Sequence, residues 1–233
     1  MNNRNWDSPK NAFVNLSNYR STTNYIKDKI FILVETSQFI LDAGCGRWNR
    51  MFLPGKSSCW VGCDTDFQSV KDNKQINFGI VSDIQHQGFQ QDTFDLIVTN
   101  DVVEHLENPK SFIRSCHKML KKNGYLVIAT PNMYSLYGIL VSITPYWVKQ
   151  NIFKIIFGIG CANEVYYYRL NTPNTLKTVL SANGFSKISV VLLNKLSSGS
   201  FKVRLLWFWY YYLCKIPIMR KFSPGLLCIA RKT

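Results

Sequence analysis

The sequence has no apolar run that could cross a lipid bilayer, because none reaches about 18 uninterrupted apolar residues. Its first residues, MNNRNWDSPKNAF, lack the apolar core of a signal peptide, so we do not expect secretion. Its seven cysteines include no CxxC pair, and none of its three histidines stands at a zinc-ligand interval from them. We therefore expect no structural zinc site, and we expect thiols without disulfides in a reducing, cytoplasmic compartment.

Acidic residues are nearly missing from the second part of the chain. Residues 133–233 carry 13 Lys and Arg and a single acid, Glu164, whereas residues 1–132 carry 15 Lys and Arg against 13 Asp and Glu. The net charge of +14 therefore resides almost entirely in the second part, which is also rich in aromatic residues. This asymmetry indicates a phosphate-bearing partner or a membrane surface.

Short apolar segments alternate with helical patterns along the first part. A helix is predicted over residues 16–36, and another over residues 102–120. Thr172 is a candidate cap for a helix within residues 171–185, and strands are predicted at 186–194 and 225–231. This alternation predicts an α/β fold with a mostly parallel sheet and crossover helices. Five earlier segments read as strands that end on polar residues: FILDAG (39–44), CWVGCDTD (59–66), INFGIVSDI (76–84), TFDLIVTNDV (93–102) and KKNGYLVIATPN (121–132).

Glycine is missing where a dinucleotide-binding turn needs it. The stretch FILDAGCGRW contains Gly44 and Gly46, which allow a sharp turn and close approach of a ligand to the backbone. The fingerprint G-x-G-x-x-G would need its third glycine at Asn49, so a turn that holds a pyrophosphate is poorly supported. Asp64, at the end of the second strand segment, can accept hydrogen bonds from both hydroxyls of a ribose.

Together these motifs resemble the class I S-adenosylmethionine-dependent methyltransferases. The resemblance covers residues 39–132, and more loosely 165–190 and 226–233. The segment YRLNTPNTLKTVLSANGF resembles the type that methylates oxygen in ubiquinone biosynthesis. The resemblance to this class implies a Rossmann-like, doubly wound sheet of seven strands with helices on both faces, in a single domain over residues 1–233.

The resemblance also implies a role for each motif. The turn would surround the aminocarboxylate and adenosine of the cofactor, the second strand end would hold the ribose, and Asp83 and Ile84 would contact the adenine. Arg47 and Trp48 depart from the family motif, and Arg47 either pairs with the cofactor carboxylate or faces solvent. Tyr19 and Arg20 are further candidates for that carboxylate. The expected cofactor residues are Asp42, Gly44, Cys45, Gly46, Asp64, Thr65, Asp83, Ile84, Asn100 and Arg20.

Asp101, Glu104 and His105 stand at i, i+3 and i+4, so the predicted helix places them on one face. Methylation of a hydroxyl requires loss of its proton, which calls for a base or a metal. In the ubiquinone type, an acid-x-x-Glu-His group is associated with divalent metal use, so the resemblance implies a Mg²⁺ site at these three residues. The alternative is that Asp101 caps the helix, Glu104 is solvated and His105 packs near the cofactor.

Two insertions bear on the substrate. Residues 133–168 are predicted to form an apolar lid, and residues 201–222 form a second insertion before the last strand. Its stretch LLWFWYYYL (205–213) is flanked by cations and fits a helix at a membrane surface, with a buried cap helix or a dimer seam as alternatives. The sequence NDVV replaces the Asn/Asp-Pro-Pro-aromatic motif of amino-group methylation, so nucleic acid is not the expected partner.

These patterns predict a cytoplasmic methyltransferase, peripheral at the inner face of a membrane. Its acceptor would be an oxygen of a hydrophobic or lipid-linked small molecule, such as a quinone precursor or a lipid-linked glycan. A methyltransferase of a soluble metabolite or of RNA is an alternative. A nicotinamide-dependent oxidoreductase and a catalytically idle, membrane-associated partner protein are alternatives of another class. The sequence does not determine the oligomeric state.

Overall fold

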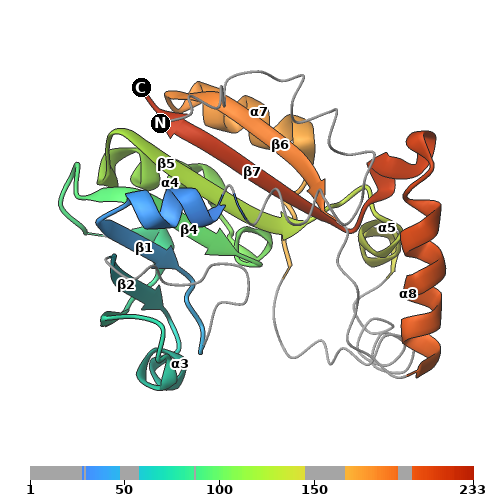
Figure 1. Ribbon diagram of the computed structural model, residues 1–233, viewed down its shortest axis with the longest axis horizontal. Helices are drawn as coiled ribbons and strands as arrows, with labels where there is room; N and C mark the ends of the chain where they lie inside the picture. Colours follow the sequence, from blue (N-terminus) through green and yellow to red (C-terminus); the bar gives the residue numbers. More distant parts are fainter. Residues whose placement is uncertain (1–27, 29, 48–57, 87, 145–165, 194–200) are drawn as a thin grey trace.

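The computed structural model describes residues 28, 30–47, 58–86, 88–144, 166–193 and 201–233. They are organised around one sheet with the strand order β3-β2-β1-β4-β5-β7-β6 (Figure 1). Strands β1 to β5 run parallel, whereas β7 runs antiparallel to both β5 and β6. This confirms the predicted doubly wound, mostly parallel α/β sheet of seven strands. The strands are β1 (Phe39–Ala43), β2 (Cys59–Asp64), β3 (Phe78–Val81), β4 (Phe94–Asn100), β5 (Leu120–Pro131), β6 (Phe185–Leu193) and β7 (Gly225–Lys232).

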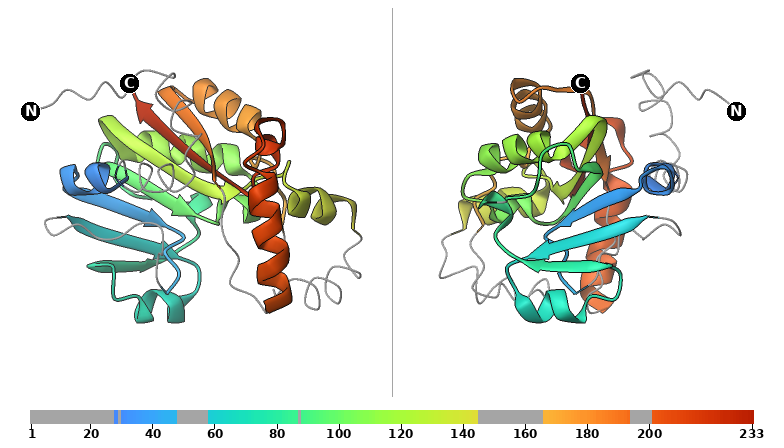
Figure 2. Two further views of the ribbon diagram at one scale, coloured as in Figure 1. Left: turned by 45° about the vertical axis from the view of Figure 1, so that its right-hand side comes forward. Right: turned by 90° about the vertical axis from the view of Figure 1, so that its left-hand side faces the viewer.

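Helices cover both faces of the sheet, as predicted. Residues 30–36 are helical and lie against one face, while α4 and α7 lie against the other (Figure 2). The labelled helices are α3 (Phe67–Asp72), α4 (Pro109–Met119), α5 (Leu136–Ile143), α7 (Pro173–Ala182) and α8 (Phe201–Leu213). The described residues also include three short 3-10 helices: η2 (Ile84–His86), η3 (Val103–His105) and η4 (Pro217–Phe222).

The central strands read as continuous apolar runs because both of their faces are buried. In β4, Leu96 and Val98 pack on the side of the helix at residues 30–36, and Ile97 packs on the side of α4 and α7. Successive side chains of a strand point to opposite faces, so one short segment contributes to two cores. This explains why alternation of apolar and polar residues is weak here.

The prediction of one continuous helix over residues 102–120 was wrong. The chain forms η3, then an extended residue at Leu106, and starts α4 afresh at Pro109. Proline has no backbone N–H and disfavours helical geometry in the residue before it. Asn108 accordingly has φ −122° and ψ 71°, and its side-chain oxygen accepts a hydrogen bond from Ser111 N at 3.2 Å, which caps α4.

The described helices of the two predicted insertions, α5 and α8, lie beyond the sheet at the carboxyl ends of the parallel strands (Figures 1 and 2). The first contains α5, and its residues 145–165 lie outside the described chain. The second contains α8 and η4. Among the helices that the structure describes, none is long and apolar enough to cross a membrane.

The start of α7 offers a test of the fold. Thr172 Oγ1 accepts a hydrogen bond from Thr175 N at 3.1 Å, and Thr175 Oγ1 accepts one from Thr172 N at 3.2 Å. Thr172→Ala should lower the free energy of unfolding by about 1 kcal/mol because it leaves helix amides without a partner. Thr172→Ser keeps the hydroxyl and should restore most of the loss. Chemical denaturation measures both, and equal stability of Thr172→Ala and the parent protein would contradict the capping assignment.

Candidate active site

The order of the strands reverses between β1 and β4, and a cavity of about 650 Å³ opens at their carboxyl ends. Its wall comes from the ends of β1 to β4, from η2 and η3, and from Tyr167. Of the predicted cofactor residues in the described chain, all except Asp42 line it: Gly44, Cys45, Gly46, Asp64, Thr65, Asp83, Ile84 and Asn100. The structure therefore brings together residues from four separate segments, while their contacts with a cofactor stay predictions.

The turn after β1 is held by backbone hydrogen bonds and by close packing. Gly44 N and Cys45 N both donate to the carbonyl oxygen of Cys63, at 2.7 and 3.1 Å. Gly44 has φ +79°, and a Cβ atom there would lie 2.3 Å from a methyl group of Val102. Only glycine fits, because the conformation is left-handed and the loop after β4 fills the space. The two loops that line the cavity are thus packed directly against each other.

Asp64 is tied to the glycine turn. Its carboxylate accepts hydrogen bonds from Gly46 N at 2.9 Å and from Asp66 N at 3.0 Å. Each carboxylate oxygen has a second lone pair, so both can still accept from a ligand hydroxyl. The bonds orient the carboxylate at the cavity wall before any ligand binds.

Two residues that the sequence analysis missed hold the cofactor residues in place. Asn73, which is buried at the end of α3, donates through its amide to the carbonyl oxygens of Cys45 at 3.2 Å and Gly46 at 3.0 Å. Gln85 N donates to Asp83 at 2.8 Å, and its side-chain oxygen accepts from Asn108 N at 2.9 Å. No local pattern marks Asn73, because it acts on a segment that is distant in sequence, and the bond of the Gln85 side chain to Asn108 is likewise distant.

The end of β4 supplies polar groups to the same cavity. The side-chain oxygen of Asn100 is buried and has no hydrogen-bond partner within the described chain. Asp101 follows with φ +54°, a left-handed conformation that is costly for a residue other than glycine. A buried oxygen without a partner carries a desolvation cost that a donor from a ligand would remove.

The predicted metal site does not fit this geometry. Asp101 and His105 line the cavity, but Glu104 does not, and the described chain contains no group of three His, Cys, Asp or Glu arranged to hold a metal ion. The i, i+3, i+4 alignment fails because Asp101 is left-handed and η3 is a single 3-10 turn. The alternative roles also need correction, since no side chain caps η3 and Glu104 is buried, with 2% of its surface exposed.

Glu104 instead belongs to a buried network that joins three segments. Its carboxylate accepts a hydrogen bond from Thr130 Oγ1 at 3.0 Å, and Thr130 accepts one from the Asn171 amide at 2.6 Å. The backbone oxygen of Glu104 accepts from Tyr167 N at 2.8 Å and Tyr168 N at 3.2 Å. The network holds the segment around Tyr167 against η3. Glu104 therefore positions one wall of the cavity.

Two further candidates that the structure describes, Arg47 and Asp42, do not line the cavity. Arg47 is exposed and pairs with Asp72 at 3.8 Å, which favours the solvent-facing alternative. Asp42 is buried in β1 and does not line the cavity, so its predicted cofactor role stays untested. Tyr19, Arg20 and Trp48 lie outside the described residues.

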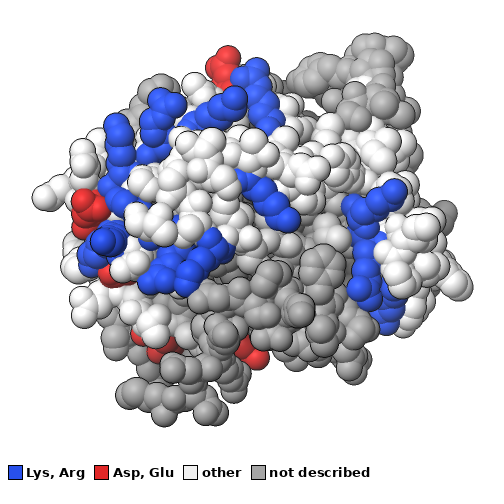
Figure 3. All heavy atoms as spheres, turned by 90° about the horizontal axis from the view of Figure 1, so that it is seen from above, with Lys and Arg blue, Asp and Glu red and all other residues white. Residues whose placement is uncertain are grey.

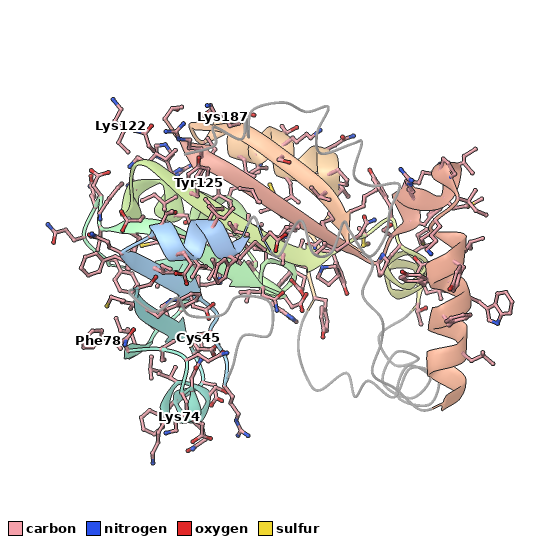
Figure 4. All side chains as sticks on the ribbon, in the orientation of Figure 1. Cys45, Lys74, Phe78, Lys122, Tyr125 and Lys187 are labelled. Atoms are coloured by element: carbon pink, nitrogen blue, oxygen red, sulfur yellow. The ribbon has the colours of Figure 1, made fainter. Side chains whose placement is uncertain are left out.

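Cys45 is a buried thiol beside two carboxylates. It lies at the carboxyl end of β1, whereas Lys122, Tyr125 and Lys187 lie at the opposite end of the sheet (Figure 4). Burial and the negative charges of Asp42 and Asp64 raise the pKa of the Cys45 thiol to about 12. The thiol therefore stays protonated and neutral at physiological pH. Six of the seven cysteines are described, and none of these six forms a disulfide.

The polar groups and the space of the cavity wall fit S-adenosylmethionine. Gly44 leaves room for close approach to the backbone, Asp64 presents two oriented acceptors for the ribose, and the oxygen of Asn100 awaits a donor such as the amino group of the methionine end. The fit rests on the polarity and the space of the wall.

Comparisons with known proteins agree with this fit. Residues 41–128 match the Methyltransf_11 family, a methyltransferase domain. The mitochondrial ubiquinone biosynthesis O-methyltransferase of Rattus norvegicus is 28% identical over 159 residues, which cover 63% of this chain and 44% of the relative. The ubiquinone biosynthesis O-methyltransferase of Maricaulis maris is 25% identical over 156 residues, 63% of this chain and 58% of the relative. The chain thus spans about half the length of these curated relatives.

Solved structures share the fold. A S-adenosylmethionine-dependent methyltransferase from Mesorhizobium loti superposes with a TM-score of 0.59 at 16% identity, covering 93% of this chain and all of its own. The phosphoethanolamine N-methyltransferase 2 of Haemonchus contortus, solved with S-adenosylmethionine, gives 0.56 at 15% identity and covers 89% of this chain and 52% of its own. At these identities the likeness concerns the fold alone.

Residues 41–128 form a methyltransferase domain, and the strand order with the cavity at the switch of the sheet is that of the class I S-adenosylmethionine-dependent methyltransferase fold. Within that class, its similarity is to the ubiquinone biosynthesis O-methyltransferases.

The ribose assignment can be tested at Asp64. Asp64→Ala removes two charge-assisted hydrogen bonds and should raise the Kd for S-adenosylmethionine roughly 100-fold. Isothermal titration measures it, and circular dichroism checks that the fold persists. Asp72→Asn, which changes a nearby exposed carboxylate outside the cavity, should leave the Kd unchanged. An unaltered Kd for Asp64→Ala would refute the assignment.

The raised pKa of Cys45 predicts slow alkylation. At pH 8 its thiolate population is negligible, so iodoacetamide should modify Cys45 at least about tenfold more slowly than the partly exposed Cys59. Mass spectrometry of digests resolves the two sites. Comparable alkylation rates for the two cysteines would contradict the raised pKa of Cys45 and the burial and negative charges that cause it.

Proposed function

We propose that the protein transfers the methyl group of S-adenosylmethionine to a hydroxyl oxygen of a hydrophobic or lipid-linked small molecule. A quinone precursor and a lipid-linked glycan are the acceptor classes that suit it, reached at the cytoplasmic face of an anionic membrane. The observation that carries the proposal is the cavity in which His105 and Tyr167 stand beside the cofactor turn. The names of the curated relatives support oxygen as the methylated atom.

S-adenosylmethionine supplies a methyl group that is already activated by its sulfonium, so the chain has to align the acceptor and take up its proton. His105 lines the cavity at the end of η3, adjoining the residues expected around the methionine end. Imidazole is the side chain best suited to accept a proton near neutral pH. We assign the uptake of the acceptor's hydroxyl proton to His105.

Aromatic side chains support a flat, apolar acceptor. The ring of Tyr166 packs against His105 with a centroid distance of 4.3 Å, and Tyr166 stacks on Tyr168 at 5.6 Å. Tyr167, which lines the cavity, carries the guanidinium of Arg169 over its ring at 5.0 Å. Of these tyrosines Tyr167 lines the cavity, where its ring can make offset or edge contacts with an aromatic ligand.

His105→Ala should lower kcat for a phenolic acceptor by about 10²- to 10⁴-fold, while the Kd for S-adenosylmethionine stays within a few-fold of the parent value. The difference in kcat between His105→Ala and the parent protein should shrink as the pH rises, because an ionised phenol needs no base. The measurement is transfer of labelled methyl to a phenol with a short prenyl tail, to the same phenol without the tail, to a lipid-linked glycan and to RNA.

His117→Gln provides the matched control, since His117 packs against Phe185 of β6, does not line the cavity and should not affect turnover. Faster transfer to the tailed phenol or to the lipid-linked glycan than to the untailed phenol supports the proposed acceptor class. Preferred transfer to RNA, or an unchanged kcat in His105→Ala, would refute the corresponding part of the proposal.

A further inference from the structure

We propose that α8 and η4 form a docking surface for an anionic lipid bilayer, with the exposed face of α8 lying in the headgroup region. This deepens the proposed function by naming the surface that brings the site to a lipid-linked acceptor. It can nevertheless be tested without any turnover.

The outward side of α8 carries a continuous apolar stripe, in a helix whose sequence is apolar nearly throughout. Exposed large side chains recur at i, i+3, i+4, i+7, i+8 and i+11, which is the spacing of a single helical stripe. On a helix whose only role is to cover a core, this stripe would point inward. Trp209 is 66% exposed, and Ile218 in η4 is 70% exposed. The stripe consists of Leu205, Phe208, Trp209, Tyr212, Leu213 and Ile216.

Among the described residues of α8 and η4, cations and no acid accompany the stripe. Lys215 lies over the rings of Tyr211 and Tyr212, at 5.1 and 4.6 Å, and Arg220 and Lys221 follow in η4. Figure 3 shows blue side chains beside white ones at the end of the molecule that carries α8, with no red among them. The sequence has no Asp or Glu after Glu164. Aromatics with cations beside them suit the headgroup level of a bilayer with anionic lipids.

The helix is fixed to the sheet, so the surface has a defined orientation. Tyr210 OH donates to the carbonyl oxygen of Phe222 and accepts from Leu136 N at 3.1 Å, which joins α8, η4 and α5. The Asn132 amide, at the end of β5, donates to the carbonyl oxygens of Lys221 at 2.9 Å and Ser223 at 2.8 Å. The docking surface therefore stands at the same carboxyl end of the sheet as the cavity (Figure 1).

A second copy of the chain is a poorer occupant of this surface. A two-fold contact places the same patch on both partners, so cations would face cations with no acid in this part of the chain to balance them. A bilayer with anionic headgroups supplies the missing negative charge and an apolar phase together.

The test is flotation of the full chain with vesicles of phosphatidylcholine, alone or with about 30% phosphatidylglycerol. The parent protein should bind the anionic vesicles and release as salt rises. The double variants Phe208→Ser/Trp209→Ser and Lys215→Glu/Lys221→Glu should each bind roughly tenfold more weakly.

Matched controls use equivalent side chains elsewhere. Phe78→Ser removes another exposed aromatic, in β3, and Lys74→Glu/Lys122→Glu reverses two cations away from α8 (Figure 4). Both should bind vesicles as the parent does. Unchanged Kd values for S-adenosylmethionine show that all variants are folded.

Parent-like binding by both α8 variants, or no binding of the parent to either vesicle, would overturn the proposal. A dimeric parent in light scattering whose α8 variants become monomeric would assign the face to a second copy and likewise overturn it. Methyl transfer to a detergent-solubilised acceptor is measured separately, so failure of docking and failure of the proposed reaction remain distinguishable.

Discussion

The parallel pairing of β1 with β4 is the constraint on which the rest of the structure depends. Leu41 lies opposite Ile97 in this pair, and the chain turns away from it in opposite directions on the two sides. The crossovers diverge there, so the carboxyl ends of these strands stay open as a cavity. Each polar group of the site then enters from the end of a strand, where a backbone already fixed by the sheet sets its direction.

Around this opening, hydrogen bonds within the protein orient the polar side chains and the glycine turn before a ligand binds. Asp64 binds two backbone amides, Asp83 binds the amide of Gln85, and Asn73 fixes the glycine turn through two carbonyl oxygens. Glu104 does the same for the Tyr167 segment through its backbone oxygen. A site held in this way loses less conformational entropy on binding, which favours affinity for a flexible cofactor.

The sequence predicted the strands and the cofactor turn because their signals are local. A polar residue after each apolar run marks a strand end, and Gly44 marks a turn whatever follows it. The role of Asn73 escaped because it depends on which segments the sheet brings side by side, and so does the contact of the Gln85 side chain with Asn108. Pro109 marks the break before α4 in the sequence. The i, i+3, i+4 spacing of Asp101, Glu104 and His105 predicts a shared face only if these residues are α-helical, and they are not. The buried position of Glu104 follows from Thr130, which belongs to a distant strand.

The attachment of α8 has a consequence for how such an enzyme can diverge. Among the described hydrogen bonds, the Tyr210 hydroxyl joins α8 to backbone atoms of α5 and η4, and the Asn132 amide joins the end of β5 to backbone oxygens of Lys221 and Ser223. Backbone acceptors do not depend on the identity of the residues that carry them. The outer stripe of α8 can therefore change its side chains freely while the helix keeps its place. The surface that meets a partner and the cavity that performs chemistry are in this sense separable modules, able to evolve or to be engineered one at a time.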